Sequence, residues 1–367
     1  MRLFDPFLYE KVHLLIMLAF TIYYFYYIQG RGGVKFLNRS SSFHGIFLYA
    51  IVFIILIGFR PVHFAFGDTV KYAKTFSNYS QISERITTSR DSLFYLFMWG
   101  CSQVMNVNWF FLLVEIMYVV PIVASCWRLY KKNSGIGVVF CFSAFSFFSY
   151  SVNGIRNGVA LSLVLLALTF IQGNSRDKVV CGILSALAIS IHASAALPVV
   201  CMLGACFIKK PKFFFNFWAL AILISLVAGN TVTNLFASLG FDERISDYIH
   251  PEIEEDIYTV TGFRWDFLLY SAMPILLGWY AVIKKKVMNS TYLLLLGTYI
   301  LANAFWIMVI RAEFSNRFAY LSWFLYPIVL AYPLLKLKIW PKTQGRKTAV
   351  IMMAHLAFTL FMVFIVG

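Results

Sequence analysis

Residues 136–172 read IGVVFCFSAFSFFSYSVNGIRNGVALSLVLLALTFIQ, and this stretch decides the fold class of the chain. It holds two apolar runs, each near the length of a helix that crosses a bilayer, and its only charged residue is Arg156. The whole chain is similar, since 60% of its 367 residues are hydrophobic and 13% are charged. An ordinary soluble domain has about 25% charged residues. We therefore expect a membrane protein.

Apolar runs recur outward from this stretch to both ends of the chain. They predict an all-α polytopic membrane protein, a single integral domain over residues 1–367, with about 12 transmembrane helices. The predicted spans lie at about 11–29, 45–59, 109–129, 136–152, 155–172, 179–193, 195–208, 213–229, 266–283, 291–310, 318–335 and 349–366.

The net charge of +15 divides unevenly between the two ends of the predicted spans. Six clusters of Lys and Arg, with one acid among them, carry +18, and the rest of the chain carries −3. They are Arg31/Lys35/Arg39, Arg128/Lys131/Lys132, Arg176/Lys178, Lys209/Lys210/Lys212, Lys284/Lys285/Lys286 and Lys336/Lys338/Lys342/Arg346/Lys347. Because Lys and Arg collect in cytoplasmic loops, we expect these clusters in the cytoplasm and both termini outside. The net charge of +15 thus indicates how the chain is oriented in the membrane, and we expect no nucleic-acid partner.

Two longer segments fall on the predicted outer side. The segment 60–108 is expected to be a loop with two membrane-parallel helices, because Tyr72, Phe76 and Tyr79 recur at helical spacing among polar residues. The segment 230–265 is acidic and holds seven of the sixteen acids between Phe241 and Asp256. It is either a solvated loop that keeps anionic headgroups away or a mobile lid over a bound substrate.

Several classes of chemistry have no motif in this chain. The six cysteines form no CxxC pair, and no HExxH or Asp-x-Asp motif occurs, so we expect neither a metal nor a disulfide framework. The predicted cytoplasmic loops are short and lack a Walker motif, so no cofactor or nucleotide domain is expected there. Any catalysis should face outward.

Charged residues at the outer ends of spans are candidates for function, because they are costly near a bilayer. Arg60 ends the second span and is followed by Gly67, Asp68 and Tyr72. Arg60 could extend to the headgroups while Asp68 caps a helix that begins at Thr69. Alternatively, Asp68 is a base and Arg60 binds a phosphate.

Asn153, Arg156 and Asn157 share one helix face at the tight turn between two spans. Gly154 and Gly158 would allow a close helix contact, but they do not explain the arginine. A guanidinium between two amides suits phosphate or pyrophosphate, because its fork matches two oxygens.

His192 is the next candidate on the predicted outer side. A histidine near a span end is often satisfied by a neighbouring helix, yet a neutral imidazole at the depth of Arg156 could also accept a hydroxyl proton. Arg317, with Tyr320 beside it, could contact an anionic ligand. Arg311 with Glu313 is either a second such site or a pair that compensates charge in a tight turn, and Arg264 with Asp266 is a further candidate pair.

This set of residues, in this order, resembles the EpsG-like branch of the Wzy-type polysaccharide polymerases of bacteria. The similar stretches are Arg60 with Gly67-Asp68 and Tyr72, Asn153 to Asn157, His192-Ala193-Ser194, and Arg317 to Tyr320. The resemblance covers most of the chain. One departure is that family members tend to have Arg-Gln where this chain has Arg156-Asn157.

The resemblance implies a metal-independent glycosyltransferase of lipopolysaccharide or exopolysaccharide biosynthesis at the outer face of the bacterial cytoplasmic membrane. The fold would be similar to the C class of glycosyltransferases. The expected partners are glycans linked to undecaprenyl pyrophosphate, the lipid bilayer and a protein that regulates polymer length. His192, or else Asp68, would be the base. The expected substrate-binding residues are Arg60, Tyr72, Asn153, Arg156, Asn157, Arg264, Arg311, Arg317 and Tyr320.

Three other functions fit parts of this pattern. A flippase for lipid-linked sugars would also need arginines, but it should place charges through the depth of the bundle and often has repeated halves. A membrane O-acyltransferase would need a histidine near a cytoplasmic acyl donor. A scaffold or length regulator would not need polar residues so near the bilayer.

Overall fold

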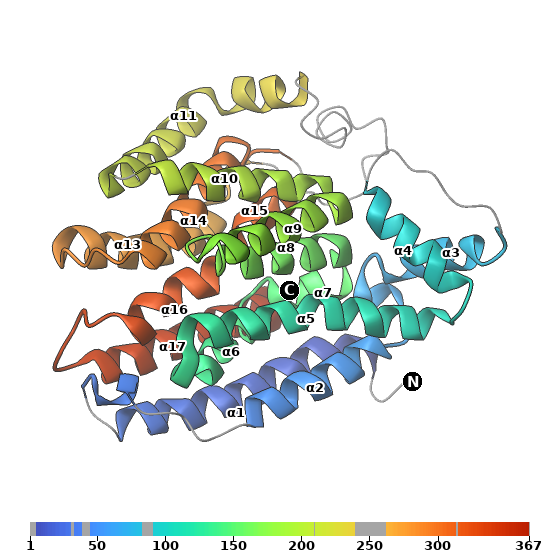
Figure 1. Ribbon diagram of the computed structural model, residues 1–367, viewed down its shortest axis with the longest axis horizontal. Coiled ribbons are helices and arrows are strands. Elements are labelled where there is room, and N and C mark those ends of the chain that lie inside the picture. The colour runs from blue at the N-terminus through green and yellow to red at the C-terminus, as the bar shows by residue number, and fades with distance from the viewer. Residues whose placement is uncertain are drawn as a thin grey trace. The chain divides into compact units, whose positions relative to one another are not determined.

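The computed structural model describes residues 5–30, 33–38, 45–82, 91–208, 210–238, 262–312 and 315–366, and its regular elements there are all helices (Figure 1). Seven of these described helical runs are long and apolar enough to cross a membrane. They are Pro6–Gln29, Val107–Phe142, Pro211–Gly229, Trp265–Lys284, Ser290–Met308, Asn316–Lys336 and Gln344–Val366. Four shorter apolar helices accompany them at Gly45–Gly58, Ser92–Ser102, Ile155–Leu168 and Ala193–Phe207. The prediction of an all-α polytopic membrane protein is confirmed.

The described residues form two compact units. The first unit, Met1–Ala196 with Ala331–Gly367, contains α1 (Tyr9–Gln29), α2 (Gly45–Gly58), α3 (Thr69–Tyr79), α4 (Ser92–Ser102), α5 (Val107–Tyr130), α6 (Ser134–Phe142), α7 (Phe147–Val152), α8 (Ile155–Leu168), α9 (Ser175–Ile191) and α17 (Gln344–Phe361). The second, Leu197–Leu330, contains most of α10 (Ala196–Phe207), α11 (Pro211–Ser238), α13 (Trp265–Trp279), α14 (Ser290–Met308) and α15 (Asn316–Trp323). Helix α16 (Tyr326–Lys336) contributes to both.

In the first unit, sequence neighbours and distant helices pack in pairs. Helix α1 packs along α17, α2 along α5, and α8 against both α5 and α9 (Figure 1). The segment 60–108 contains α3 and α4, and these two helices contact each other. The acidic stretch from Phe241 to Asp256 lies outside the described residues.

Two predicted spans are interrupted in the structure. Residues 318–335 divide into α15 and α16, and the span at 136–152 has the longer break. Residues 136–152 were expected to form one helix, but the helix stops at Phe142 and resumes at Phe147. The Ser143 hydroxyl donates to the Val139 carbonyl at 2.6 Å, and the backbone N–H of Phe147 donates to the carbonyl of Ala144. Serine side chains compete with the helical pattern in this way, which a hydropathy profile does not register.

A helix break inside an apolar bundle leaves carbonyl groups that need other donors. Four side chains from three other helices donate to carbonyls at or beside the break. His355 Nε2 lies 2.9 Å from the carbonyl of Phe140, His13 Nε2 2.8 Å from that of Phe142, Thr359 Oγ1 2.8 Å from that of Ser143, and Tyr118 OH 3.0 Å from that of Phe147. Residues of α1, α5 and α17 therefore hold the break in place.

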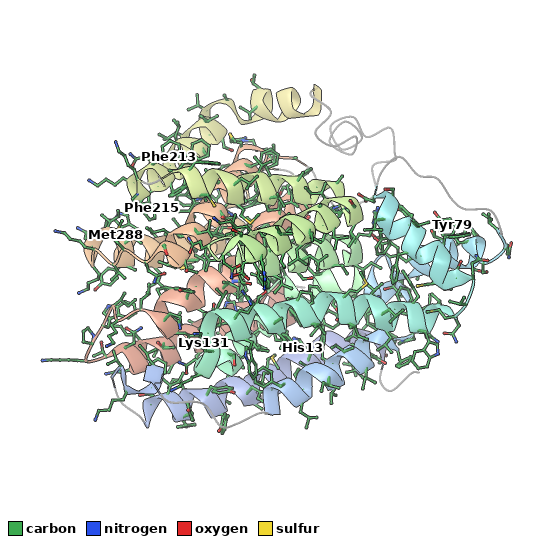
Figure 2. All side chains as sticks on the ribbon, in the orientation of Figure 1. His13, Tyr79, Lys131, Phe213, Phe215 and Met288 are labelled. Atoms are coloured by element: carbon green, nitrogen blue, oxygen red, sulfur yellow. The ribbon has the colours of Figure 1, made fainter. Side chains whose placement is uncertain are left out.

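His13 illustrates how complete this compensation is. The Phe142 carbonyl can only accept, so Nε2 of His13 carries the proton and Nδ1 accepts from the Tyr49 hydroxyl at 2.8 Å. The side chain is buried and lies among the packed side chains of the first unit (Figure 2). His13 is thereby explained as a structural residue.

The second unit is held by polar contacts between its helices. The indole N–H of Trp218 donates to Asn303 at 2.9 Å, and the Asn303 amide donates to Ser322 at 3.1 Å. The indole of Trp323 donates to the Ser271 hydroxyl at 2.7 Å. These bonds join α11 to α14, α14 to α15, and α15 to α13.

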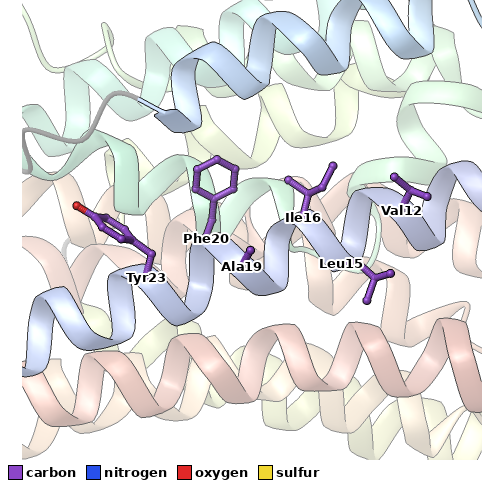
Figure 3. A pocket seen from close by; sticks show the side chains of 6 residues that line it. All are labelled: Val12, Leu15, Ile16, Ala19, Phe20 and Tyr23. Atoms are coloured by element: carbon purple, nitrogen blue, oxygen red, sulfur yellow. The ribbon is translucent and has the colours of Figure 1, made fainter.

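A shallow groove of 510 Å³ runs along one face of α1 (Figure 3). Its lining is almost wholly apolar and consists of Val12, Leu15, Ile16, Ala19, Phe20 and Tyr23. Such a face is typical of a helix that meets lipid.

Thr359→Val should destabilise the protein, because it removes the hydroxyl that serves the Ser143 carbonyl and keeps the side-chain shape. A buried acceptor left without a donor costs about 1–3 kcal/mol. Thr298→Val is the matched control, since the buried Thr298 hydroxyl bonds to Leu294 in its own helix, whose carbonyl keeps the backbone donor. The melting temperature in detergent should fall clearly more for Thr359→Val, and equal falls would contradict this role.

Candidate functional site

The carboxylate of Asp91 gathers three donors from distant parts of the first unit. Oδ2 accepts from Arg156 Nη1 at 2.5 Å and lies 3.1 Å from His192 Nδ1, and Oδ1 accepts from the backbone N–H of Ala193 at 2.8 Å. The Asp91 side chain is only 4% exposed. Residues separated by 65 and 101 positions are thus joined at one side chain.

Local backbone geometry explains how the carboxylate reaches these donors. Asp91 precedes α4 and has φ 53° and ψ 35°, the left-handed region that aspartate tolerates better than most residues. Helix α9 ends at Ile191, and the next residue, His192, is extended before a short 3-10 helix, η5 (Ala193–Ala195), begins. The N–H of Ala193 therefore starts a helical turn and is available to the carboxylate.

Arg156 lies in the first turn of α8, and its guanidinium meets aromatic residues as well as Asp91. Its Nε donates to the Tyr72 hydroxyl at 3.1 Å, and the Tyr95 ring centroid lies 5.3 Å from its Cζ. The side chain is 16% exposed. Among the described residues, Nη2 of Arg156 and Nε2 of His192 have no hydrogen-bond partner, so both atoms remain for a ligand.

The turn before α3 docks on the turn between α7 and α8. Asn153 Oδ1 accepts from the backbone N–H of Asp68 at 3.0 Å, and the Thr69 hydroxyl donates to the Val152 carbonyl at 2.9 Å. Gly67 has φ +56°, and a Cβ there would overlap the Asn153 amide. These contacts fix the start of α3 and so place Tyr72 against Arg156.

Arg60 is buried beneath this turn. Its Nε donates to Thr69 Oγ1 at 3.2 Å, its Nη1 donates to the Ile57 carbonyl at 2.9 Å, and its guanidinium lies over the ring of Phe111. Its electrostatic partner is Glu115 of α5, which is fully buried and accepts from a serine of α7 at 2.7 Å. Arg60 is 1% exposed and therefore supports the fold in this conformation.

The other predicted site residues divide between the two units. In the first, Asp68 is half-buried without a side-chain cap bond, and the buried Oδ1 of Asn157 has no hydrogen-bond partner among the described residues. In the second, Arg264 pairs with Asp266 at 2.6 Å, Arg311 lies 5.9 Å from the Phe263 ring, Arg317 is exposed, and the Tyr320 ring lies 5.8 Å from that of Trp323. Glu313 lies outside the described residues. The structure thus joins Tyr72 to Arg156 directly and Arg156 to His192 through Asp91, with Asp68 and Asn153 at the adjoining turn.

The sequence did not single out Asp91 or Glu115. Asp91 directly precedes the apolar run of α4, and a lone acid before such a run was the available signal. Glu115 is the one acid within α5, so its cost in an apolar helix could have marked it. In both cases the partner is distant in sequence and was not predictable.

Gly154 and Gly158 were expected to allow a close contact with a neighbouring helix. A Cβ on Gly158 would lie 2.6 Å from the Tyr150 carbonyl, so this glycine lets α8 fold back on α7. A Cβ on Gly154 would meet only Asn157, at 3.9 Å. The close contact is therefore within the α7–α8 hairpin.

Comparison with known protein families gives a match over residues 45–366, to the EpsG family. The chain belongs to the EpsG family. Membership associates this EpsG-family protein with polysaccharide biosynthesis. Neither a curated protein nor a solved structure matches the chain. The matched range includes Asp91, Arg156 and His192.

The described part of this EpsG-family protein groups no three His, Cys, Asp or Glu side chains that could hold a metal ion. The positive charge nearest to Asp91 is instead the guanidinium of Arg156. Burial alone would raise the pKa of Asp91, but the His192 hydrogen bond and charge, the Ala193 N–H and the Arg156 charge together lower that pKa to about 2. The carboxylate is therefore ionised at neutral pH.

The stability that Asp91 contributes should depend on pH in a defined direction. Its folded pKa of about 2 lies below the ordinary value of 3.8, so its contribution is full above the ordinary value and is lost as pH falls towards the folded value. The melting-temperature difference between wild type and Asp91→Asn should be largest at neutral pH and shrink between about pH 4 and pH 2. A difference that stays constant over this range would contradict the ionised pair.

Proposed function

We propose that this EpsG-family protein polymerises oligosaccharide repeat units linked to undecaprenyl pyrophosphate at the outer face of the bacterial cytoplasmic membrane. The observation that carries the proposal is that Asp91 holds Arg156 and His192 together, each with one nitrogen left for a ligand. Transfer of a sugar from a lipid pyrophosphate needs a cation for the leaving group and a base for the attacking hydroxyl. Arg156 could be this cation and His192 this base, and both bind the Asp91 carboxylate.

The proposed reaction is a direct glycosyl transfer. An acceptor hydroxyl oxygen forms a bond to the anomeric carbon of the donor's reducing-end sugar, while the bond from that carbon to the pyrophosphate oxygen breaks. The electron pair leaves with undecaprenyl pyrophosphate, and the hydroxyl proton passes to Nε2 of His192. Nη2 of Arg156 stabilises the departing charge, which is worth several kcal/mol in a partly dehydrated site.

The membrane arrangement in this proposal follows the charge distribution. In this proposal the chain crosses the membrane about twelve times, with α6 and α7 counted as one passage and α15 and α16 as another. The basic clusters then lie in the cytoplasm, and both termini and the Asp91 cluster lie outside. Helices α3 and α4 lie parallel to the membrane and guide the lipid tails. Arg264, Arg311, Arg317 and Tyr320 of the second unit remain predicted substrate-binding residues, and Asp68 is the second choice of base.

A flippase is the alternative function, and one observation favours it. Arg60 and Glu115 are ionisable groups buried among apolar helices, as a transport path would require. However, Glu115 is the ninth residue of α5 and so lies only about 12 Å along that helix. Both groups are near the end where the Asp91 cluster lies, which supports chemistry at one face over passage through the bundle.

Purified protein in a lipid bilayer, given only the cognate lipid-linked repeat unit, should produce a ladder of longer lipid-linked glycans. The ladder should form without a nucleotide sugar and with a chelator present, because the donor is already activated by its pyrophosphate. Gel separation of the glycans measures it. An unchanged monomer band from folded protein would contradict polymerase activity, and movement of that monomer across the bilayer would then support the flippase.

Arg156→Gln should reduce the rate of ladder formation by about 100-fold or more, because the departing charge loses its guanidinium. Arg317→Ala should also abolish long products. Arg128→Gln is the matched control, since Arg128 likewise donates through Nε to a hydroxyl, that of Thr169 at 2.9 Å, and lies over an aromatic ring. Arg128 is not part of the proposed site, so Arg128→Gln should leave the ladder unchanged. Equal losses in the Arg156 and Arg128 variants would contradict a specific role.

A further inference from the structure

The Asp91 carboxylate determines which nitrogen of His192 carries a proton. An ionised carboxylate can only accept hydrogen bonds, and its Oδ2 lies 3.1 Å from Nδ1 of His192. Nδ1 must therefore be protonated. In the neutral imidazole the lone pair then lies on Nε2, which faces no protein partner among the described residues.

The same oxygen also holds the arginine. Arg156 Nη1 donates to Oδ2 at 2.5 Å, so one atom of Asp91 contacts both the proposed base and the proposed anion-binding group. The other oxygen accepts from the Ala193 N–H at 2.8 Å and prevents the carboxylate from rotating away. Nη2 of Arg156 and Nε2 of His192 thus have a fixed spacing, set by a side chain that touches neither reacting group of the substrate.

We propose that Asp91 is the positioning residue of this site: it holds His192 as the tautomer with its lone pair on Nε2 and fixes Arg156 beside it. This inference rests on the proposed function for its catalytic consequence. The tautomer itself is a property of the protein alone. A purely structural ion pair would need the arginine but not the histidine.

Asp91→Asn tests the proposal with almost no change in shape. The asparagine oxygen still accepts from Ala193, so its amide NH₂ faces Nδ1 of His192 and Nη1 of Arg156. His192 then satisfies the amide by accepting at Nδ1, which moves its proton to Nε2. Base catalysis is lost, and kcat for polymerisation should fall by about 10²–10⁴-fold while KM changes little.

The tautomer is measured directly by ¹⁵N NMR of ¹⁵N-histidine-labelled protein in lipid, without substrate. The His192 signal is assigned by its absence from His192→Gln. Wild type should show protonated Nδ1 and Asp91→Asn protonated Nε2. Asp91→Glu, which keeps the charge, should retain the wild-type tautomer and recover part of kcat. Asp177→Asn is the control, because Asp177 caps the other end of α9 through Asn174, and it should change neither the tautomer nor kcat.

The outcomes separate this inference from the proposed function. A wild-type His192 with its proton on Nε2, or the same tautomer in wild type and Asp91→Asn, would overturn the positioning role even if the ladder forms. Failure of folded wild type to form a ladder would overturn the polymerase, while the tautomer result would still decide what Asp91 does. An equal fall in kcat for Asp91→Glu and Asp91→Asn, with the tautomer kept in Asp91→Glu, would also overturn the catalytic role of the tautomer.

Discussion

The structure of the first unit depends on the need to satisfy backbone carbonyls where a helix breaks among apolar side chains. Side chains of α1, α5 and α17 donate to four carbonyls at or beside the break between α6 and α7. These donors compensate carbonyls that lose their helical partners where the chain turns before α7. The break therefore positions the α7–α8 hairpin, whose corner carries Asn153 and Arg156.

From that corner the contacts extend to the candidate site in short steps. Asn153 holds the turn before α3, α3 brings Tyr72 to Arg156, and Arg156 meets the carboxylate that precedes α4. His192 joins from the end of α9. Each step is a hydrogen bond between elements that also pack through apolar side chains, so the polar contacts set alignment while burial supplies most of the stability.

The sequence predicted the helices well and their polar contacts only in part. Hydropathy located the apolar helices, because burial in lipid demands long apolar runs, and helical spacing located α3. It did not predict the break at Ser143, since three of the four donors around it are more than a hundred residues away. Arg156 and His192 were named because charge and imidazole are rare near spans, but Asp91 was not, since an acid in a loop is ordinary until its partners are known.

The order of the Asp91 contacts along the chain has a consequence for biogenesis. Asp91 is synthesised 65 residues before Arg156 and 101 before His192, so the anion is already at the membrane when the arginine enters it. A cation that inserts beside an existing counter-ion avoids most of the cost of an unpaired charge. Arg60 and Glu115 follow the reverse order, with the cation first. The insertion machinery would therefore meet each later charge with its electrostatic partner already in place, and the site closes only when α9 has been delivered.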